Sequence, residues 1–448
     1  MARISIDFNN ITSKIKLMQA MGQPPFAGGF LSFDFSYMNY LKEAGTTYSR
    51  LHDVGGAFGG NRFVDVPNLF RDFEADENDP SSYDFAFTDV LLEAMQSYDL
   101  APIFRLGVTI ENQAHIKAYR INPPKDPAKW ARICEHIIRH YNEGWADGYH
   151  YNIKYWEIWN EPENGVKGKN QMWTGTAEQF FELYDVTAKH LKSCFGDTIK
   201  VGGYGASGFY GIYYDPEKYR VSVPKKEPDD RYEKDTYRVE FLYKFFDYIK
   251  EHNSPIDFFT WHSYANVGKT RILDEFLHNF LCERGYGDLE RHLNEWNNAH
   301  ERSLVGRSES SAATAAMLCS MQESHTDMLC YYDSRLGGGS YGGLFDTNYK
   351  PTCTYYVFYA YGKLYSLGGQ AQTTVEDGDG LYVTAATDGS RKGVLIANNN
   401  DKAVTLETDL AGDFKAYMIG TENLFAETEI EPDKIELAPY DVIFLETE

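Results

Sequence analysis

Cysteine is scarce in this chain, and long apolar runs are lacking. The six cysteines show no CxxC spacing and no pairing with histidine, at positions 134, 194, 282, 319, 330 and 353. This pattern argues against a zinc site or a disulfide framework and favours a reducing compartment. Residues 1–19 contain no uninterrupted apolar segment, and no stretch of about 18 apolar residues occurs anywhere. We therefore expect a cytoplasmic protein without a membrane partner.

Positive charge is also in short supply. The chain has 43 Lys and Arg against 66 Asp and Glu, for a net charge of −23, and no basic run is longer than two residues. A protein this acidic repels phosphate backbones and anionic bilayers, so we expect no nucleic-acid partner. Aromatic residues, in contrast, make up 15% of the chain. Such richness suits a large core, and it also suits surfaces that stack against sugars.

Short apolar runs alternate with amphipathic stretches from about residue 28 to residue 365, which is typical of a parallel sheet built from βα units. Eight strands are expected, at 26–33, 48–53, 101–107, 154–162, 199–207, 257–264, 291–298 and 327–334. Helical spacing of apolar residues is clearest in segments 129–145, 177–195 and 238–252. The pattern predicts an α/β fold with a (β/α)8 TIM barrel over residues 21–366.

The period changes after the barrel. Residues 367–448 form short alternating segments separated by Gly, Asn and Asp, which predicts a small antiparallel β-sandwich. Residues 1–20 alternate similarly, so we expect the N-terminal strand to join that sandwich. The tail holds no candidate catalytic pair. We expect it to act as a structural buttress or as a contact in a homo-oligomer.

Chemistry in a TIM barrel lies at the C-terminal ends of the strands. Acidic residues at these ends are Asp53, Glu161, Glu295 and Asp333. Asn160-Glu161-Pro162 closes the fourth strand in "YWEIWNEPEN", and Asn294-Glu295-Trp296 closes the seventh. Strands four and seven face each other across the mouth of an eight-stranded barrel.

Two carboxyl groups across a small pocket are what acetal hydrolysis requires. One stays protonated to assist the leaving oxygen, and the other is ionised to meet the oxocarbenium-like carbon. Trp156, Trp159 and Trp296 are expected to supply apolar walls that raise the pKa of the acid by desolvation. No metal and no organic cofactor is needed for this reaction. A non-catalytic carbohydrate-binding protein remains the alternative of another class.

The segment "YWEIWNEPEN" resembles the acid/base segment of the retaining clan-A glycoside hydrolases, above all family 39, the β-xylosidases and α-L-iduronidases. The resemblance extends to "YSRLHD", "YDFAFTDVLLEAMQSYDLAPIFRLG", "FFTWHSY" and "YYDSRLGGGSYGGLFDTNYKPTCTYYVF". It implies an exo-acting O-glycosyl hydrolase with Glu161 as the acid/base and Glu295 as the nucleophile. The substrate would be an oligosaccharide or another glycoside.

The resemblance also implies the surroundings of the two glutamates. Asn160 would hold the 2-hydroxyl of the sugar, and Arg50 and Tyr264 would donate hydrogen bonds to the nucleophile. The remaining residues expected to line the sugar pocket are His52, His262, Trp296 and Tyr332.

The sequence departs from the family pattern where the sugar would be gripped. "FRLGVTIEN", "LNEWNN" and "YYDS" replace the usual segments, and they leave the substrate open. The net charge of −23 favours a terminal neutral sugar, and the family resemblance favours a β-xyloside among these sugars. Arg105 and Arg335 lie at the exits of strands three and eight, so a uronic-acid-specific enzyme of the iduronidase or glucuronidase type is an alternative. A β-galactosidase-like hydrolase is another.

Other patterns carry less weight. Gly203, Gly205 and Gly208 match a GxGxxG motif without the helix that phosphate binding needs, so we interpret them as part of the barrel rim. His136 and His140 have metal-ligand spacing but no evident third ligand. Glu157 lies on the same strand face as Glu161 and is expected to be a buried structural carboxylate. Glu163 follows the proline on the loop.

Overall fold

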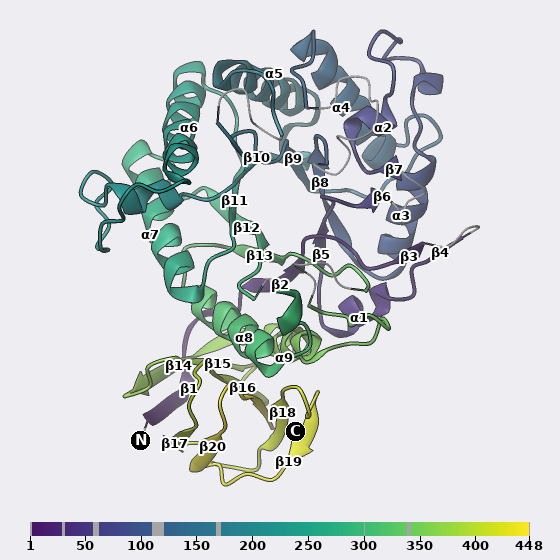
Figure 1. Ribbon diagram of the computed structural model, residues 1–448. Coiled ribbons are helices and arrows are strands. Elements are labelled where there is room, and N and C mark those ends of the chain that lie inside the picture. The colour runs from purple at the N-terminus through teal and green to yellow at the C-terminus, as the bar shows by residue number, and fades with distance from the viewer. Residues whose placement is uncertain are drawn as a thin grey trace.

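The computed structural model describes residues 2–28, 32–56, 62–109, 121–166, 172–299, 301–337, 341 and 343–447. The larger part is a closed barrel of parallel strands surrounded by helices. The smaller part is a curled sheet that carries both chain ends (Figure 1). The predicted fold class, a TIM barrel followed by an antiparallel β-rich domain, is confirmed.

The barrel closes in the strand order β10-β11-β12-β13-β2-β5-β8-β9. Its strands are β2 (Leu17–Met21), β5 (Tyr48–Arg50), β8 (Ala101–Leu106), β9 (Tyr155–Ile158), β10 (Lys200–Ala206), β11 (Phe258–Ser263), β12 (Glu290–Trp296) and β13 (Met328–Tyr331). Seven of the expected segments match these strands.

The first strand was predicted at 26–33, and this prediction is wrong. The barrel strand is β2, which pairs with β13 and β5. Segment 26–33 instead contributes β3 (Ala27–Gly28) and β4 (Phe33–Asp34), a short antiparallel pair, and residues 29–31 lie outside the described part. The polar Gln19 interrupts the apolar pattern of β2, yet its side chain is fully buried and donates to the Gly45 carbonyl.

Helices surround the barrel (Figure 1). They are α1 (Met38–Glu43), α2 (Val66–Leu69), α3 (Ala86–Ser97), α4 (Pro127–Glu143), α5 (Ala177–Phe195), α6 (Tyr232–His252), α7 (Val267–Arg284), α8 (Ser308–Gln322) and α9 (Cys353–Leu367). Their starts are encoded locally. Asp126 accepts from the first free N–H groups of α4, and Thr176 forms a capping box with Gln179 at the start of α5.

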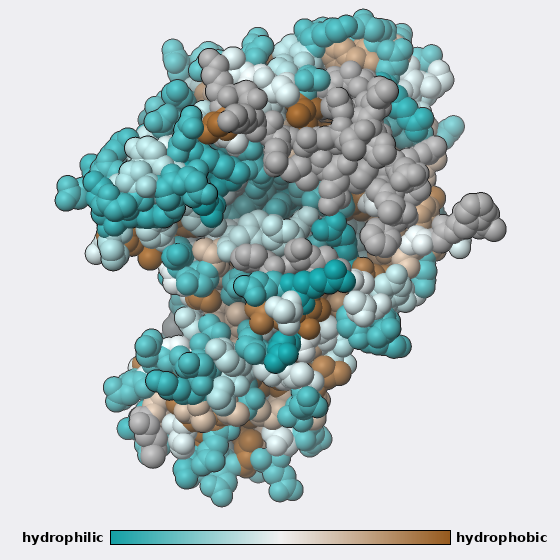
Figure 2. All heavy atoms as spheres, viewed as in Figure 1, coloured by the Kyte–Doolittle hydropathy of each residue, from teal (hydrophilic) through white to brown (hydrophobic). Residues whose placement is uncertain are grey.

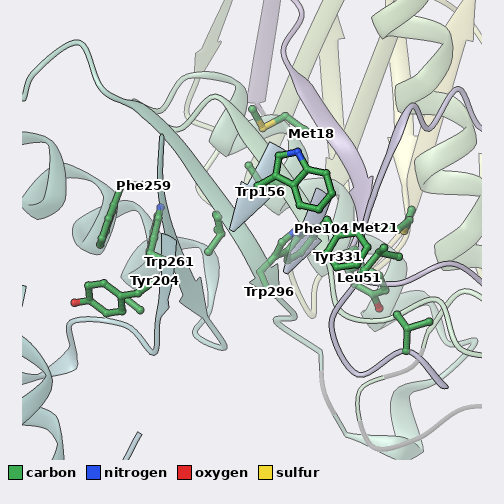
Figure 3. Close-up of a cluster of buried hydrophobic side chains, with 14 of the residues drawn as sticks. Met18, Met21, Leu51, Phe104, Trp156, Tyr204, Phe259, Trp261, Trp296 and Tyr331 are labelled. Carbon is green, nitrogen blue, oxygen red and sulfur yellow. The ribbon is translucent and has the colours of Figure 1, made fainter. Parts of the chain in front are cut away.

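Strand alternation separates two kinds of side chain. Outward-facing residues form the hydrophobic core between the barrel and its helices, including Trp156 and Trp296 (Figure 3). Inward-facing residues form a small apolar layer inside the barrel: Ala20, Ile103, Tyr155, Phe258, Met328 and Cys330. Farther along the strands the inward positions become polar, and this change places the site at the C-terminal mouth.

The C-terminal domain is one hydrogen-bonded sheet in the order β19-β18-β21-β16-β15-β14-β1-β17-β20. Its strands are β1 (Ala2–Lys14), β14 (Gly369–Glu376), β15 (Leu381–Thr387), β16 (Lys392–Asn398), β17 (Val404–Thr408), β18 (Lys415–Ile419), β19 (Ala426–Thr428), β20 (Lys434–Leu437) and β21 (Val442–Glu446). The N-terminal strand β1 runs antiparallel to β14 and parallel to β17. Helices α8 and α9 lie between the barrel and this sheet (Figure 1).

The short strands β6 (Gly55–Gly56) and β7 (Arg62–Phe63) form a further pair beside the barrel. None of the helices in the described part of the chain combines the length and the apolarity that a membrane crossing would need.

Candidate active site

A pocket of about 1320 Å³ opens at the C-terminal end of the barrel. Figure 2 shows the surface hollowed near the middle of the barrel, with hydrophilic residues along the side of α6 and α7. The pocket is lined by residues from several strand ends, among them His52, Asp53, Asn160, Glu161, Tyr264, Glu295 and Tyr332. The structure therefore brings both predicted glutamates into one cavity.

Glu161 reaches the pocket through an unusual backbone turn after β9. Trp159 and Glu161 have φ angles of 71° and 46°, a region that non-glycine residues seldom adopt. The N–H of Glu161 donates to the carbonyls of Tyr204 and Gly205 at the end of β10, which holds the turn in place. Strain of this kind is a feature of functional sites, and here it directs the carboxyl group of Glu161 into the cavity.

Glu295 lies at the end of β12 and is held by two donors. The Tyr264 hydroxyl donates to Oε1 at 2.6 Å, and Arg50 Nη1 donates to Oε2 at 3.1 Å. Burial and the charge of Glu295 hold the pKa of Tyr264 well above its usual range, so the phenol keeps its proton and acts as a donor. These are the two contacts to Glu295 that the family resemblance implied.

Arg50 is fully buried and connects three strand ends. Its Nε donates to Glu157 at 2.7 Å, and its Nη2 donates to the Asn160 side-chain oxygen at 2.6 Å. Glu157 also accepts hydrogen bonds from Thr260 and Asn294, both at 2.7 Å. Burial alone would raise the pKa of Glu157, but Arg50 and these donors lower it. Glu157 is thus the buried structural carboxylate that strand alternation predicted.

His262 lies between the two glutamates. Its Nδ1 is 2.8 Å from Glu161 Oε1, and its Nε2 is 3.7 Å from Glu295 Oε2. One carboxylate oxygen of Glu161 and one of Glu295 lie within 4.8 Å of each other. Retaining glycosidases hold their two carboxyl groups roughly 5–5.5 Å apart and inverting ones hold them farther apart, so the close approach of these oxygens favours retention.

Glu161, His262 and Glu295 interact as a trio. The expectation that the pKa of Glu161 is raised is wrong, because it is lowered. Burial would raise it, but the hydrogen bond and charge of His262, with the charges of Arg238 and Lys234, lower the pKa of Glu161. Burial would lower the pKa of His262, yet Glu295 and Glu161 raise it. In the free protein the proton of the pair is therefore held on the histidine side of the His262–Glu161 hydrogen bond.

The tryptophans expected as apolar walls lie elsewhere, and this part of the prediction is wrong. Trp296 is fully buried against Tyr331 and Phe358, and Trp156 stacks on Phe104 (Figure 3). The pleat of a strand points neighbouring side chains to opposite faces, so Glu295 faces the pocket and Trp296 faces the helices. Trp159 packs against Trp130 and Trp173 in the same outer layer.

The residues that follow β13 add further polar side chains near the pocket. The Tyr332 hydroxyl donates to Asp53 Oδ2 at 2.6 Å, and Arg335 pairs with Asp333 at 2.7 Å. His52 lies 3.7 Å from Glu295, and burial together with nearby cations holds its pKa well below the ordinary value, so it is neutral. His52 and Tyr332 both line the pocket, as expected.

Arg105 does not serve the pocket in the way that the uronic-acid alternative required. Its side chain is fully buried, and Nη2 donates to Asp65 at 2.7 Å and to Thr109 at 3.1 Å. Asp65 compensates its charge inside the protein. The prediction that Arg105 could pair with a sugar carboxylate is therefore wrong.

The surroundings of Glu161 could not be predicted from the sequence, apart from the place of Glu163 on the loop. Asn164 donates to Glu161 Oε2 and accepts from Arg238 Nη2 at 3.1 Å. Glu163 is only 1% exposed and accepts from the N–H and hydroxyl of Ser207. Asn164 and Glu163 fall within the conspicuous segment at the end of strand four, so their position was a signal. Arg238 belongs to α6, and nothing local in the sequence connects it with the site.

Glu161, His262 and Glu295 offer ligand atoms close enough to hold a metal ion. Their surroundings favour another interpretation. Arg50 and Tyr264 already donate to both oxygens of Glu295, and a buried guanidinium beside a cation site is unfavourable. We interpret the trio as an acid–base arrangement. On α4, His140 is packed on the Phe85 ring and bonded to Asp89, and His136 Nδ1 lies 2.8 Å from the Arg132 carbonyl oxygen.

A sequence model described as Glycosyl hydrolases family 39 matches residues 61–333, about three-fifths of the chain. The chain belongs to glycoside hydrolase family 39. Members of this family are O-glycosyl hydrolases that retain the anomeric configuration, and the resemblance to family 39 that the sequence predicted is confirmed.

Two curated relatives of this family 39 hydrolase are β-xylosidases. The protein from Geobacillus stearothermophilus is 22% identical over 265 residues, which are 56% of this chain and 44% of the relative. The protein from Caldicellulosiruptor saccharolyticus is 28% identical over 131 residues, which are 27% and 25% of the two chains. The matches thus span less than half the length of either relative.

Solved structures agree on the fold of this family 39 hydrolase. A glucosidase from Croceicoccus marinus matches with a TM-score of 0.74 and 20% identity, covering 100% of this chain and 98% of the other. A family 39 enzyme from Xanthomonas axonopodis pv. citri matches with a TM-score of 0.65 and 16% identity, covering 99% and 96%. The two-part architecture is therefore shared over the full length.

Proposed function

We propose that this hydrolase removes a terminal neutral sugar, with a β-xyloside favoured, by double displacement with Glu295 as the nucleophile and Glu161 as the acid/base. The observation that carries this proposal is the Glu161–His262–Glu295 arrangement. Glu295 is held by a buried guanidinium and a phenol, and Glu161 shares a hydrogen bond with a titratable imidazole.

In the first step an oxygen of Glu295 attacks the anomeric carbon while Glu161 donates a proton to the departing glycosidic oxygen. That proton lies in the His262–Glu161 hydrogen bond of the free enzyme. The charge of Glu295 raises the pKa of His262, and this charge disappears when the covalent bond to the sugar forms. His262 then becomes a weaker base, and Glu161 is left as a carboxylate that can accept a proton from the incoming water.

The preference for a neutral sugar rests on the charge compensation of Arg105 and Arg335. These are the guanidiniums that the sequence offered for a sugar carboxylate, and each is paired with a protein carboxylate. The relatedness to two β-xylosidases supports xylose among the neutral sugars. Asn160 lines the pocket and is held by Arg50, and this position suits a contact with the 2-hydroxyl.

A panel of nitrophenyl glycosides tests the proposal: β-xyloside, β-glucoside, β-galactoside, β-glucuronide and α-L-iduronide. Wild type, Glu161→Ala, Glu295→Ala and the exposed control Glu182→Ala on α5 are compared. We expect the β-xyloside to have the highest kcat/KM, the control to match wild type, and Glu295→Ala to be inactive. A preference for the uronides would contradict the neutral-sugar assignment. Wild type that cleaves none of the five would favour a carbohydrate-binding protein.

A further inference from the structure

One side of the pocket is strongly basic, although the chain as a whole is acidic. The loop 207–231 between β10 and α6, the first turns of α6 and the start of α7 place cations along the pocket. They are Lys225, Lys226, Arg231, Lys234, Arg238 and Lys269. With a net charge of −23 over the chain, a cluster of this kind does not follow from composition.

Part of this basic side is neutralised by the protein, and part is not. Lys226 pairs with Asp229 at 2.7 Å, and Arg238 pairs with Asp235 at 3.2 Å. Within the described ranges, Lys225, Lys234 and Lys269 have no carboxylate at ion-pair distance. Lys234 is also half-buried, and burial followed by the charge of Arg238 lowers its pKa. A bound anion would favour the charged form of Lys234 and would also compensate the charge of Arg238.

Two members of the basic side, Arg238 and Lys234, act on Glu161. Arg238 is connected to Glu161 through the side chain of Asn164. The charges of Arg238 and Lys234 act on the pKa of Glu161. The acid/base of a glycosidase contacts the glycosidic oxygen, so residues beyond it face the departing part of the substrate and not the sugar that is attacked.

We propose that this basic side binds an acidic group, a carboxylate or a sulfate ester, on the saccharide that leaves after cleavage. The inference rests on the proposed function because it uses Glu161 as the acid/base. The substrate would then have a neutral sugar at the attacked carbon and an acidic group on the departing saccharide. The negative field of the remaining protein discourages anions elsewhere, so the cluster selects where an acidic substrate enters.

Aryl β-D-xylosides with matched leaving groups provide the test: para-carboxyphenyl, para-sulfophenyl and the neutral para-carbamoylphenyl. For each enzyme the ratio of kcat/KM for an acidic probe to that for the neutral probe is measured. Comparing the ratio between enzymes removes the chemical reactivity of the leaving groups. We expect the wild-type ratio to exceed that of Lys225→Gln/Lys234→Gln/Lys269→Gln about fivefold, and to fall with added salt.

Lys244→Gln, an exposed position on the outer part of α6, is the matched control and should keep the wild-type ratio. Lys234→Gln alone is the second variant should the triple variant not fold. The carboxyl and sulfo probes separate the two anion chemistries. Equal ratios in wild type and the lysine variants would overturn the inference and leave the proposed function intact.

Failure of all three probes would count against the proposed function instead. In that case calorimetric binding of para-hydroxybenzoate and para-hydroxybenzamide to wild type and Lys234→Gln decides the inference without any hydrolysis. We expect the acid to bind wild type more tightly than the amide, and the difference to shrink in the variant. Equal binding of acid and amide to wild type would overturn it.

Discussion

Replacing Glu163 by glutamine should stabilise the protein at neutral and alkaline pH. The carboxyl group is 1% exposed, and it accepts from Ser207 at 2.7 and 3.0 Å through one oxygen. The other oxygen, Oε2, has no hydrogen-bond partner within the described ranges. Burial and the negative charge of Glu161 raise the pKa of Glu163 to about 7, against 4.5 for an ordinary glutamate.

A folded-state pKa above the unfolded value means that stability is full below pH 4.5 and is lost as the pH rises through 7. The free energy of unfolding falls by about 1.4 kcal/mol for each pH unit in this interval. Ionisation of Glu163 therefore destabilises the native state by about 3 kcal/mol. Glutamine stays neutral and can still accept from Ser207. The variant should therefore gain about 3 kcal/mol relative to wild type between roughly pH 4 and pH 8.

Urea unfolding followed by circular dichroism at a series of pH values measures this gain. Glu182→Gln on the exposed face of α5 serves as the control, and its difference from wild type should not vary with pH in this way. A difference between Glu163→Gln and wild type that is independent of pH would refute the raised pKa of Glu163. That result would mean that the carboxyl group ionises at its ordinary pKa despite its burial.

Three further predictions concern the site and its support. Tyr264→Phe should lower kcat/KM about 10- to 150-fold with a nearly unchanged unfolding midpoint, because one hydrogen bond to a charged acceptor is lost. An equal loss of stability would contradict a role in holding Glu295. Trp296→Phe should leave KM unchanged and lower the unfolding free energy by about 1–2 kcal/mol, because the ring lies in the core between barrel and helices. A raised KM would instead indicate that Trp296 contacts the substrate. Deleting 367–448 should give an insoluble or unfolded barrel because α8 and α9 lose the sheet they contact, and a folded, active barrel would argue against the buttress.

The sequence predicted the barrel well where strands end in conspicuous polar residues. Glu161 and Glu295 could be found because each closes an apolar run at a position where a TIM barrel exposes side chains. It was harder to predict whether the neighbouring side chains point into the barrel or toward the helices. Trp296 follows Glu295 directly, and the period of two that brings the glutamate into the pocket sends the tryptophan to the helices.

Interactions between distant segments could not be predicted. The low pKa of Glu161 depends on His262, which is 101 residues away in the chain, and on cations of α6. The strand β2 was missed because a buried glutamine interrupts its apolar pattern, and only the tertiary contact with Gly45 explains that residue. The basic side of the pocket is likewise assembled from a loop and two helix starts that share no local motif.

The central claim, that Glu161 and Glu295 divide the roles of acid/base and nucleophile, is tested most directly by azide rescue. Glu161→Ala is assayed with dinitrophenyl β-xyloside, whose leaving group departs without an acid. We expect fast formation and slow hydrolysis of the glycosyl-enzyme, with added azide restoring turnover and yielding the β-xylosyl azide. Glu295→Ala should yield only the α-azide. A β-azide from Glu295→Ala and an α-azide from Glu161→Ala would contradict the account, because the two residues would then have exchanged roles.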